Sequence, residues 1–307
     1  MRTFNRRDFI KKVLKTTALL MALPKNPFSL SSSSVSAREF SDNKIVVVKG
    51  GDPESRLKEV LKALGGLEKM MPANAKVTIK PNASFSRTPA QGVNTNPEIV
   101  YHLFKACKDA GAKEMVAFDY TSDPADICFE MSGIREAVEK GGGRIYSAEY
   151  EKYYKEVAVP KAKNLKKQLI NKDVLDCDFF INVPIPKMHD ITILTMAMKN
   201  LMGVIWDRDS YHTYNLHECV AELSSVVKPD LNIVDATRVL LTEGPHGPGK
   251  TKTHNITVAG KDIVLVDAFC CTIFDKKPED IPHVVHAHKL GIGEMDLSKA
   301  EIVKIDI

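Results

Sequence analysis

The residues best suited to chemistry lie close together in one segment, between residues 186 and 203. They are Lys187, His189, Thr192, Thr195, Lys199 and Asn200. Ammonium, hydroxyl and amide groups donate hydrogen bonds to anions, and a histidine exchanges its proton near neutral pH. The segment therefore predicts a site for a small anionic ligand, in which His189 handles a proton or a metal ion.

A strand and a helix are expected to position this segment. Residues 179–183 form a short apolar run that ends at two prolines, which is typical of a buried strand. Residues 192–202 carry apolar side chains at helical spacing, and their polar side chains at i, i+3 and i+7 would share one helix face. Such corners bind ligands in α/β sheets, because unpaired amides at a helix amino terminus favour negative charge. The same stripe also fits the solvated face of an amphipathic helix.

Strand-like and helical runs alternate along the chain after residue 43. The expected strands are 44–48, 76–79, 114–118, 179–183, 231–234 and 263–266. The expected helices are 53–64, 97–110, 124–140, 192–202, 216–227 and 267–274. This alternation predicts an α/β fold, a single large domain with a mostly parallel central sheet and helices on both faces.

Several of the expected strands end at a charged or amide residue. These residues are Lys80, Asn82, Asp119, Asp235 and Asp267. Because the carboxyl ends of parallel strands share one edge of a sheet, they could converge with Lys187 and His189 on one cleft. Each of them alone is explained as a cap or turn residue, and only the repetition favours a cleft. We expect His189, Asp235 and Asp267 to be the catalytic residues of that cleft.

A longer pattern contains this segment: Pro186-Lys187-x-His189-x-x-Thr192-x-x-Thr195-x-x-x-Lys199-Asn200-x-x-Gly203. It resembles the signature of the DUF362 family, whose members have no agreed biochemical function. The resemblance continues in Lys80-Pro81-Asn82, in residues 229–236, in Glu243-Gly244-Pro245 with Gly249, and in residues 266–268 and 290–293. We expect ligand contacts from Lys80, Asn82, Lys187, Thr192, Thr195, Lys199, Asn200, Glu243 and Gly244. Some longer relatives carry ferredoxin-like iron–sulfur segments, which implies redox work with an iron–sulfur partner.

The first residues predict an export signal. Residues 5–11, NRRDFIK, match the twin-arginine pattern, and the apolar stretch 13–23 is too short to span a bilayer. A serine-rich spacer ends in small residues at position 37, as a signal peptidase requires. We therefore expect a twin-arginine signal peptide over 1–37, a linker over 38–43 and the main domain over 44–307. The twin-arginine translocation (Tat) machinery would then be a partner, and the mature protein periplasmic or otherwise extracytoplasmic.

The leader also explains the basic charge of the chain. Residues 1–37 hold seven of the 43 basic residues and one of the 39 acidic residues, which leaves 36 basic against 38 acidic residues. Nothing in this balance indicates nucleic acid or an acidic membrane surface as a partner. No cysteine precedes Cys107, so we expect no lipid anchor. A basic, partly helical amino terminus without a targeting role is the alternative interpretation.

Residues 244–251 satisfy the phosphate-loop formula G-x-x-x-x-G-K-[ST]. That mechanism needs consecutive free amides and a helix that starts at the lysine, but two loop positions are prolines and the following residues are β-like. We expect a glycine-rich loop instead, with Glu243 and His246 at the edge of the cleft.

The six cysteines contain no C-x-x-C pair, which excludes the usual ferredoxin and zinc-ribbon spacings. Cys107, Cys219 and Cys270 are expected in the core, and the histidines at 283, 286 and 288 on a solvated helix face. The cofactor stays unknown, although His189 with Asp235, Asp267 or Glu243 would suit a first-row metal. Three hypotheses remain: an enzyme or cofactor-dependent protein, a non-catalytic anion-binding protein, and a scaffold.

Overall fold

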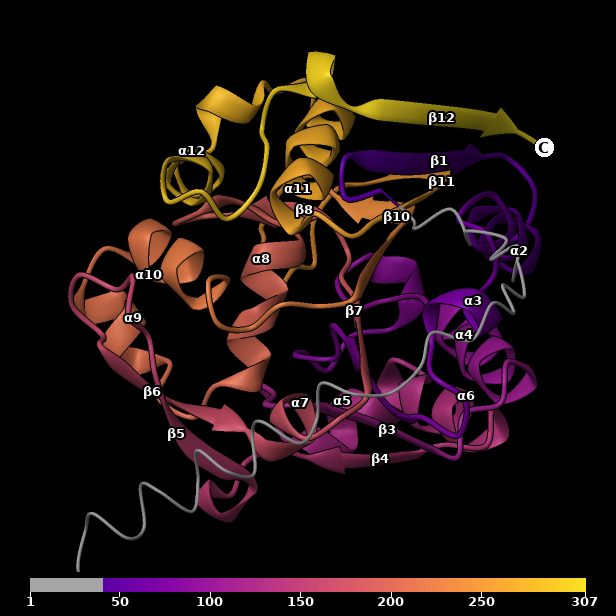
Figure 1. Ribbon diagram of the computed structural model, residues 1–307, viewed down its shortest axis with the longest axis horizontal. Coiled ribbons are helices and arrows are strands. Elements are labelled where there is room, and N and C mark those ends of the chain that lie inside the picture. The colour runs from indigo at the N-terminus through magenta and orange to yellow at the C-terminus, as the bar shows by residue number, and fades with distance from the viewer. Residues whose placement is uncertain (1–40) are drawn as a thin grey trace, which may run out of the picture. The chain divides into compact units, whose positions relative to one another are not determined.

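A computed structural model describes residues 41–307 (Figure 1). The predicted signal peptide and the first residues of the predicted linker lie outside this range. The described residues form a single α/β domain built on one large sheet. None of its helices is long and apolar enough to cross a membrane.

The eight strands of the sheet run mostly parallel. In spatial order they are β12 (Glu301–Asp306), β1 (Lys44–Lys49), β11 (Thr251–Gly260), β10 (Leu231–Leu240), β7 (Phe179–Val183), β2 (Lys76–Pro81), β3 (Glu114–Asp119) and β4 (Arg144–Ser147). Only β11 runs antiparallel to its neighbours β1 and β10, and all the other adjacent pairs are parallel. The predicted fold class is therefore confirmed.

Helices cover both faces of the sheet, because its inner strands are apolar on both sides. Alternate residues of β1 show this: Val46 and Val48 pack into one hydrophobic cluster, whereas Ile45 and Val47 pack into the other. The first cluster is covered by α2 (Pro53–Ala63), α4 (Pro97–Asp109), α5 (Ala125–Met131) and α6 (Ile134–Lys140). The second is covered by α8 (Ala197–Asn200), α10 (Leu216–Leu223), α11 (Ile263–Cys271) and α12 (Pro282–Lys289). Figure 1 shows the two groups on opposite sides of the sheet.

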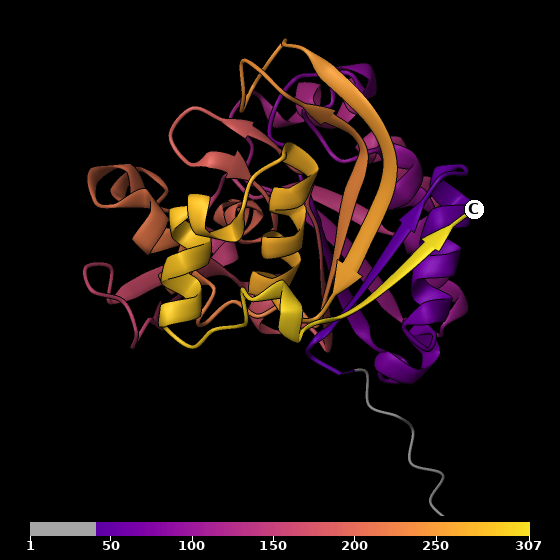
Figure 2. The same ribbon diagram turned by 90° about the horizontal axis from the view of Figure 1, so that it is seen from above.

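Smaller elements complete the domain. They are the short helices α3 (Leu67–Met70), α7 (Lys172–Leu175) and α9 (Asp209–Thr213), and two antiparallel hairpins, β5 (Tyr154–Ala158) with β6 (Lys167–Asn171) and β8 (Lys187–His189) with β9 (Ile193–Thr195). The long β10–β11 hairpin, orange in Figure 2, extends beyond the other strands of the sheet. The six cysteines are all free, and Cys107, Cys219 and Cys270 lie in the core as expected.

The expected helix over 192–202 is wrong in its first half. The chain first forms the β8–β9 hairpin, and α8 begins only at Ala197. Two local causes are visible: β-branched residues crowd positions 191–195, and the His189 ring binds the amides of Ile191 and Thr192 to close a turn. The i, i+3, i+7 polar stripe therefore does not exist, since of its members only Lys199 lies on a helix.

The expected strand over 263–266 is also wrong. These residues are the first turn of α11, which Asp262 caps by accepting hydrogen bonds from the amides of Val264 and Leu265 at 2.8 and 3.1 Å. A short, fully buried apolar run has the same pattern in a strand and in a helix, so periodicity could not separate the two. The expected helix over 124–140 is two helices, because Gly133 turns the chain with a φ of 73° between α5 and α6.

Candidate functional site

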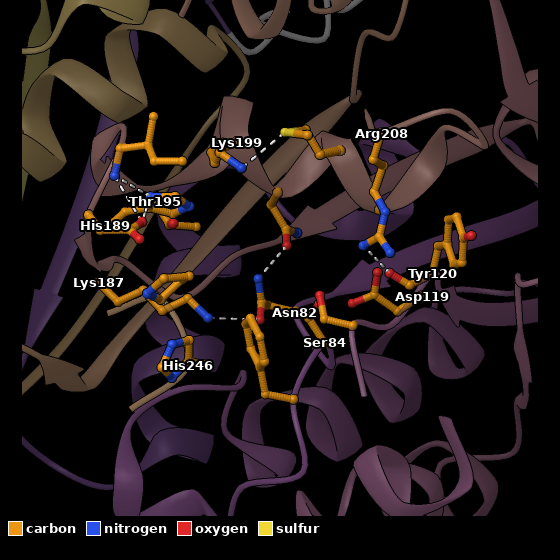
Figure 3. Close-up of a pocket in the computed structure, with 18 of the residues that line it drawn as sticks. Asn82, Ser84, Asp119, Tyr120, Lys187, His189, Thr195, Lys199, Arg208 and His246 are labelled. Carbon is orange, nitrogen blue, oxygen red and sulfur yellow. Dashed lines mark hydrogen bonds and ion pairs between the residues drawn. The ribbon is translucent and has the colours of Figure 1, made fainter. Parts of the chain in front are cut away.

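A cavity of about 370 Å³ opens where β2 and β3 end (Figure 3). The β8–β9 hairpin, α8, α9 and the loop after β10 form its remaining walls. Of the residues predicted to hold a ligand or act in catalysis, several line it together: Asn82, Lys187, His189, Thr195, Lys199 and Asn200. Asp119, at the end of β3, lines it as well. The ends of β2 and β3 therefore meet at one cavity, as the sequence predicts.

Four of the predicted ligand residues lie near the cavity without lining it. Lys80 is buried beneath the floor, and Thr192 lies in the hairpin turn, where its hydroxyl donates to the Leu194 carbonyl at 3.1 Å. Glu243 and Gly244 precede Pro245 and His246, which do line the cavity. The glycine is required there, because a Cβ at position 244 would lie 1.8 Å from the Met188 carbonyl oxygen of β8.

The expected convergence is wrong for Asp267. Because residues 263–271 are a helix, Asp267 is buried inside α11 instead of ending a strand. Its carboxylate accepts hydrogen bonds from the amides of Ala197 and Met198 at 2.6 and 3.0 Å. Burial raises the pKa of Asp267 to about 7, and those two amides oppose the rise. Asp267 therefore fixes the start of α8, which carries Lys199.

The expected convergence is wrong for Asp235 too, because β10 continues past it as far as Leu240. Its carboxylate accepts from the Asn96 amide at 2.7 Å and from the Thr237 hydroxyl at 2.6 Å. It lines a separate cavity of about 270 Å³. The Thr237 hydroxyl also accepts from the buried Arg56 guanidinium at 2.6 Å, so Asp235 belongs to a structural network between α2 and β10.

An ion pair forms part of the cavity floor. Lys80 Nζ lies 2.8 Å from Asp119 Oδ1, and the two side chains are only 1% and 3% exposed. Asp119 Oδ2 accepts from the Ala83 amide at 2.8 Å, so both carboxylate oxygens are engaged. Gly203 gives this pair its space, since a Cβ there would lie 2.1 Å from Asp119 Oδ1. The negative charge of Asp119 is therefore already balanced.

Lys187 lies in the wall with two of its three N–H groups engaged. Its ammonium donates to the Val93 carbonyl at 2.6 Å and to Asn82 Oδ1 at 3.3 Å, and it lies 4.9 Å from the centre of the Phe85 ring. Burial lowers the pKa of Lys187 to about 7, and the positive charge of Lys199 adds to this. Lys187 therefore contributes charge to the cavity, with few donors left for a ligand.

Lys199 and Arg208 have donors to spare. Lys199 donates to the Met202 sulfur at 3.0 Å, and burial together with the charge of Arg208 lowers the pKa of Lys199 to about 8. Arg208 donates to the carbonyls of Tyr120 and Thr121 at 2.9 and 3.2 Å and lies over the Tyr120 ring at 4.0 Å. Within residues 41–307, neither side chain forms an ion pair with a carboxylate. The cavity therefore holds two cations that no carboxylate of the described residues contacts as an ion pair, although the exposed Asp190 and Asp209 also line it.

His189 is neutral in this setting. Burial, followed by the charge of Lys199, lowers the pKa of His189 to about 3. Its Nδ1 lies 3.3 Å from the Thr192 amide and 2.9 Å from Asp190 Oδ1. The amide can donate only to an unprotonated Nδ1, whereas the carboxylate can accept only from a protonated one. We place the proton on Nε2, because the Thr192 amide has no other acceptor in the described chain whereas Asp190, 66% exposed, can bond to water. Nε2–H is then an unpartnered donor.

Four buried asparagines extend from the cavity into the sheet. Asn82 Nδ2 donates to Asn200 Oδ1 at 3.0 Å, Asn200 Nδ2 to Asn182 Oδ1 at 2.8 Å, and Asn182 Nδ2 to Asn232 Oδ1 at 3.0 Å. Asn232 Nδ2 donates to the Lys261 carbonyl at 3.1 Å. This asparagine chain fixes the amides of Asn82 and Asn200 in the cavity wall.

Sequence reasoning missed Arg208, Tyr120 and the serines at 84 and 122, all of which line the cavity. Arg208 follows the single tryptophan, Trp206, whose ring stacks on Tyr120 with centroids 5.4 Å apart. The sole signal was a basic residue close after the signature segment. The contact of Arg208 with the residues just after β3 depends on the tertiary fold.

A family model described as "Domain of unknown function (DUF362)" matches residues 77–272. The chain belongs to the DUF362 family. This DUF362 protein is 26% identical over 255 residues to the "Thylakoid-associated protein sll1697" of Synechocystis sp., a match that covers 77% of this chain and 74% of the relative. Membership of this family establishes a common origin but does not identify a reaction.

Two solved structures resemble this DUF362 protein weakly. One is a Thermotoga maritima protein with 12% identity and a TM-score of 0.47, over 73% of this chain and 60% of that one. The other is the lactate racemase apoprotein from Thermoanaerobacterium thermosaccharolyticum, with 14% identity and a TM-score of 0.40, over 70% of this chain and 54% of that one. The chain thus spans three fifths or less of either protein's length, and neither similarity carries an argument about function.

The loop at 244–251 does not have phosphate-loop architecture. β11 begins at Thr251, where that mechanism needs a helix. The predicted metal ligands are not assembled either, since Asp235 and Asp267 lie apart from the cavity. Within residues 41–307, no group of three or more His, Cys, Asp or Glu side chains is placed to hold a metal ion.

The expectation of a solvated histidine face on α12 is wrong for His283, which is completely buried. Its Nδ1 lies 3.3 Å from Nδ1 of His217 on α10, and the two rings stack with centroids 5.6 Å apart. Its Nε2 is buried and has no partner in the described structure. Burial, with a smaller effect of His217, lowers the pKa of His283 to about 3.

This buried ring predicts a loss of stability in acid. Below about pH 6.5 the unfolded chain protonates position 283 and the native protein does not, so protons favour unfolding by about 1.4 kcal/mol per pH unit. Between pH 6.5 and 5, the wild type should lose about 2 kcal/mol of unfolding free energy relative to His283→Gln. Urea unfolding of both proteins across this range measures the difference. If the unfolding free energies of the two proteins changed with pH in parallel, His283 would have the same pKa in the native and the unfolded state.

Proposed function

We propose that this DUF362 protein binds a small anion in the cavity at the ends of β2 and β3. One observation carries the proposal: Lys199 and Arg208 line one cavity, keep unused N–H groups and have no carboxylate partner in the described chain. Buried or half-buried cations without counter-ions are costly, and a bound anion would remove that cost. Charge-assisted hydrogen bonds from lysine and arginine are the usual means of holding carboxylates and phosphates.

Sulfate tests this proposal, because its charge is constant across the working pH range. Isothermal titration calorimetry on the wild type is expected to give saturable binding at one site. Lys199→Gln and Arg208→Gln should each weaken binding by about ten- to a hundredfold, since each removes a charged donor worth about 1.5–3 kcal/mol. Lys69→Gln on α3 and Arg144→Gln on β4, both exposed and remote from the cavity, are the matched controls.

Equal affinity in all these variants, or no binding to the wild type, would refute anion binding at this cavity. Circular dichroism and urea unfolding separate a lost contact from a lost fold. Of the hypotheses drawn from the sequence, the scaffold and a cofactor-dependent protein without an anion site would then remain.

Catalysis is a second candidate function, and His189 is the observation that favours it. Its neutral ring presents an unpartnered Nε2 in a cavity lined by Lys187 and Lys199. The carboxylates expected to assist it, Asp235 and Asp267, lie elsewhere, so the proposal commits to binding and leaves His189 as a hydrogen-bond donor to the ligand. His189→Gln keeps a side-chain N–H and should retain sulfate binding, whereas His189→Leu should weaken it.

We propose export by the Tat pathway from the sequence of residues 1–37, in which residues 5–11 match the twin-arginine pattern. Amino-terminal sequencing of the protein from its own cells should find Arg38 as the first residue of an extracytoplasmic fraction. Arg6→Lys with Arg7→Lys should block export and leave the full-length chain inside. An intact amino terminus in the wild type would refute the signal peptide without bearing on the cavity.

A further inference from the structure

The unpaired polar groups in the buried part of the cavity are nearly all donors. Lys199 uses one of the three N–H groups of an ammonium, and Arg208 uses two of the five of a guanidinium. Thr195 adds a buried hydroxyl without any partner in the described structure, and His189 adds its Nε2–H. A ligand that satisfies this wall must therefore bring many acceptors.

The buried acceptors of the same wall are already taken, and the other two carboxylates that line the cavity, Asp190 and Asp209, are exposed to solvent. Both oxygens of Asp119 are engaged by Lys80 and the Ala83 amide. Asn82 Oδ1 accepts from Lys187, and Asn200 Oδ1 accepts from Asn82. A ligand group that donates hydrogen bonds would find few partners here, whereas one that accepts them would find several.

The donors also approach from different directions. In Figure 3, Lys187 and His189 lie on one side of the cavity, Arg208 lies on the opposite side, and Lys199 projects between them. A planar carboxylate offers two oxygens in one plane and a single charge. A phosphoryl group offers three oxygens in a tetrahedral arrangement and a charge of about −1.5 to −2 near neutral pH. The donor arrangement and the charge of the cations match the phosphoryl group better.

Part of the cavity is lined by apolar and aromatic side chains. Phe85 and His246 meet edge to face with ring centroids 6.2 Å apart, and Pro245, Ile191 and Met202 line the cavity as well. A volume of about 370 Å³ is within the range of small-molecule sites and exceeds what a bare phosphate would fill. The additional space suits a compact organic group.

We infer that the anion is the phosphoryl group of a small phosphate monoester, whose organic group packs against Phe85 and His246. The inference rests on the proposed anion binding and narrows its ligand class. Arg208 and Lys199 would bind the phosphoryl oxygens, and the hydroxyl of Thr195, which has no partner in the described structure, would donate to one of them. Lys187 would add positive charge. No covalent step is part of this inference.

Four probes test it by calorimetry on the purified protein at pH 7: phenyl phosphate, inorganic phosphate, benzoate and sulfate. Phenyl phosphate should bind at least about tenfold more tightly than benzoate, which has the same ring but a carboxylate. It should also bind at least about tenfold more tightly than inorganic phosphate, which lacks the ring.

Each contrary result has its own meaning. If benzoate bound as tightly as phenyl phosphate, the anion would not be assigned as a phosphoryl group. If inorganic phosphate bound as tightly as phenyl phosphate, the proposed packing of an organic group against Phe85 and His246 would be wrong. In both cases sulfate binding that depends on Lys199 would leave the proposed function standing. Absence of binding for all four probes would overturn the inference together with the proposed function.

Two variants locate the parts of the ligand. Phe85→Leu should weaken phenyl phosphate about three- to tenfold more than it weakens inorganic phosphate, because the lost aromatic wall affects only the first ligand, whereas the lost contact with Lys187 affects both. Arg208→Lys keeps the charge and loses the planar fork, so it should weaken both phosphates and affect benzoate less. Tyr150→Leu, at an exposed aromatic outside the cavity, is the control for Phe85. A Phe85→Leu protein with an unchanged phenyl phosphate affinity would place the organic group elsewhere and overturn that part of the inference.

Discussion

Asp119→Asn is expected to lower the free energy of unfolding by about 3–5 kcal/mol. The substitution leaves the Lys80 ammonium buried beneath the cavity without its counter-charge, which was 2.8 Å away in a pair shielded almost completely from water. The asparagine Oδ1 can still accept from the Ala83 amide, but its Nδ2 then faces the Lys80 ammonium. The loss therefore reports the missing charge together with its hydrogen bond to Lys80. Urea unfolding of the wild type and the variant at pH 7 measures it.

A double variant separates the cost of an orphaned charge from the value of the pair. Lys80→Met in the Asp119→Asn background removes both charges, and should recover most of the lost stability because a buried ion pair replaced by uncharged groups is often close to neutral. A single-variant loss below about 1 kcal/mol, the value of an exposed pair, would show that water reaches these side chains in solution.

Sulfate affinity is expected to fall steeply as the pH rises above about 8. In the free protein the pKa values of Lys187 and Lys199 are about 7 and about 8, both lowered chiefly by burial. A bound anion favours the charged forms and raises both values, so the complex holds more protons than the free protein and protons promote binding. Affinity is then greatest at low pH, and should fall by up to about tenfold per pH unit for each lysine that titrates.

Calorimetry between pH 7 and 9.5, in two buffers of different ionisation enthalpy, measures both the affinity and the proton uptake. Lys199→Arg keeps a charge at all these pH values and should flatten the part of the profile above pH 8. A pH-independent affinity without proton uptake would mean that sulfate changes the protonation of neither Lys187 nor Lys199, and would contradict this prediction.

The sheet could be predicted from the sequence because its strands are short apolar runs with clear ends. β2 stops at Pro81, β3 at Asp119 and β7 before two prolines, and these local signals suffice for element type and direction. The strand predicted over residues 263–266 is wrong because all four side chains are buried. No polar residue alternates with them, so the sequence shows neither the twofold pattern of a strand nor the 3.6-residue pattern of a helix. Its cap, Asp262, was the only local signal for a helix.

The site could be predicted in part, for a related reason. Asn82 and Lys187 follow strand ends, so topology alone brings them to one edge of the sheet. The hairpin between Lys187 and Thr195 was missed because a side chain, His189, holds its turn. Arg208 was missed because nothing near it in the sequence shows that its guanidinium will reach the end of β3. A local side-chain contact decided the hairpin, and a contact between distant segments decided the position of Arg208.

The asparagine chain has a direction, and this gives the cavity a remote reporter. All four amides point the same way: each Oδ1 faces the cavity and each Nδ2 donates away from it, from Asn82 to the Lys261 carbonyl. The aligned dipoles present their negative end to the Lys187 ammonium, and hydrogen bonds in such a row polarise one another. A ligand that changes the charge at Lys187 should therefore shift the side-chain amide resonances of Asn182 and Asn232, deep in the sheet. Occupancy could then be followed by nuclear magnetic resonance at nuclei that the ligand never touches.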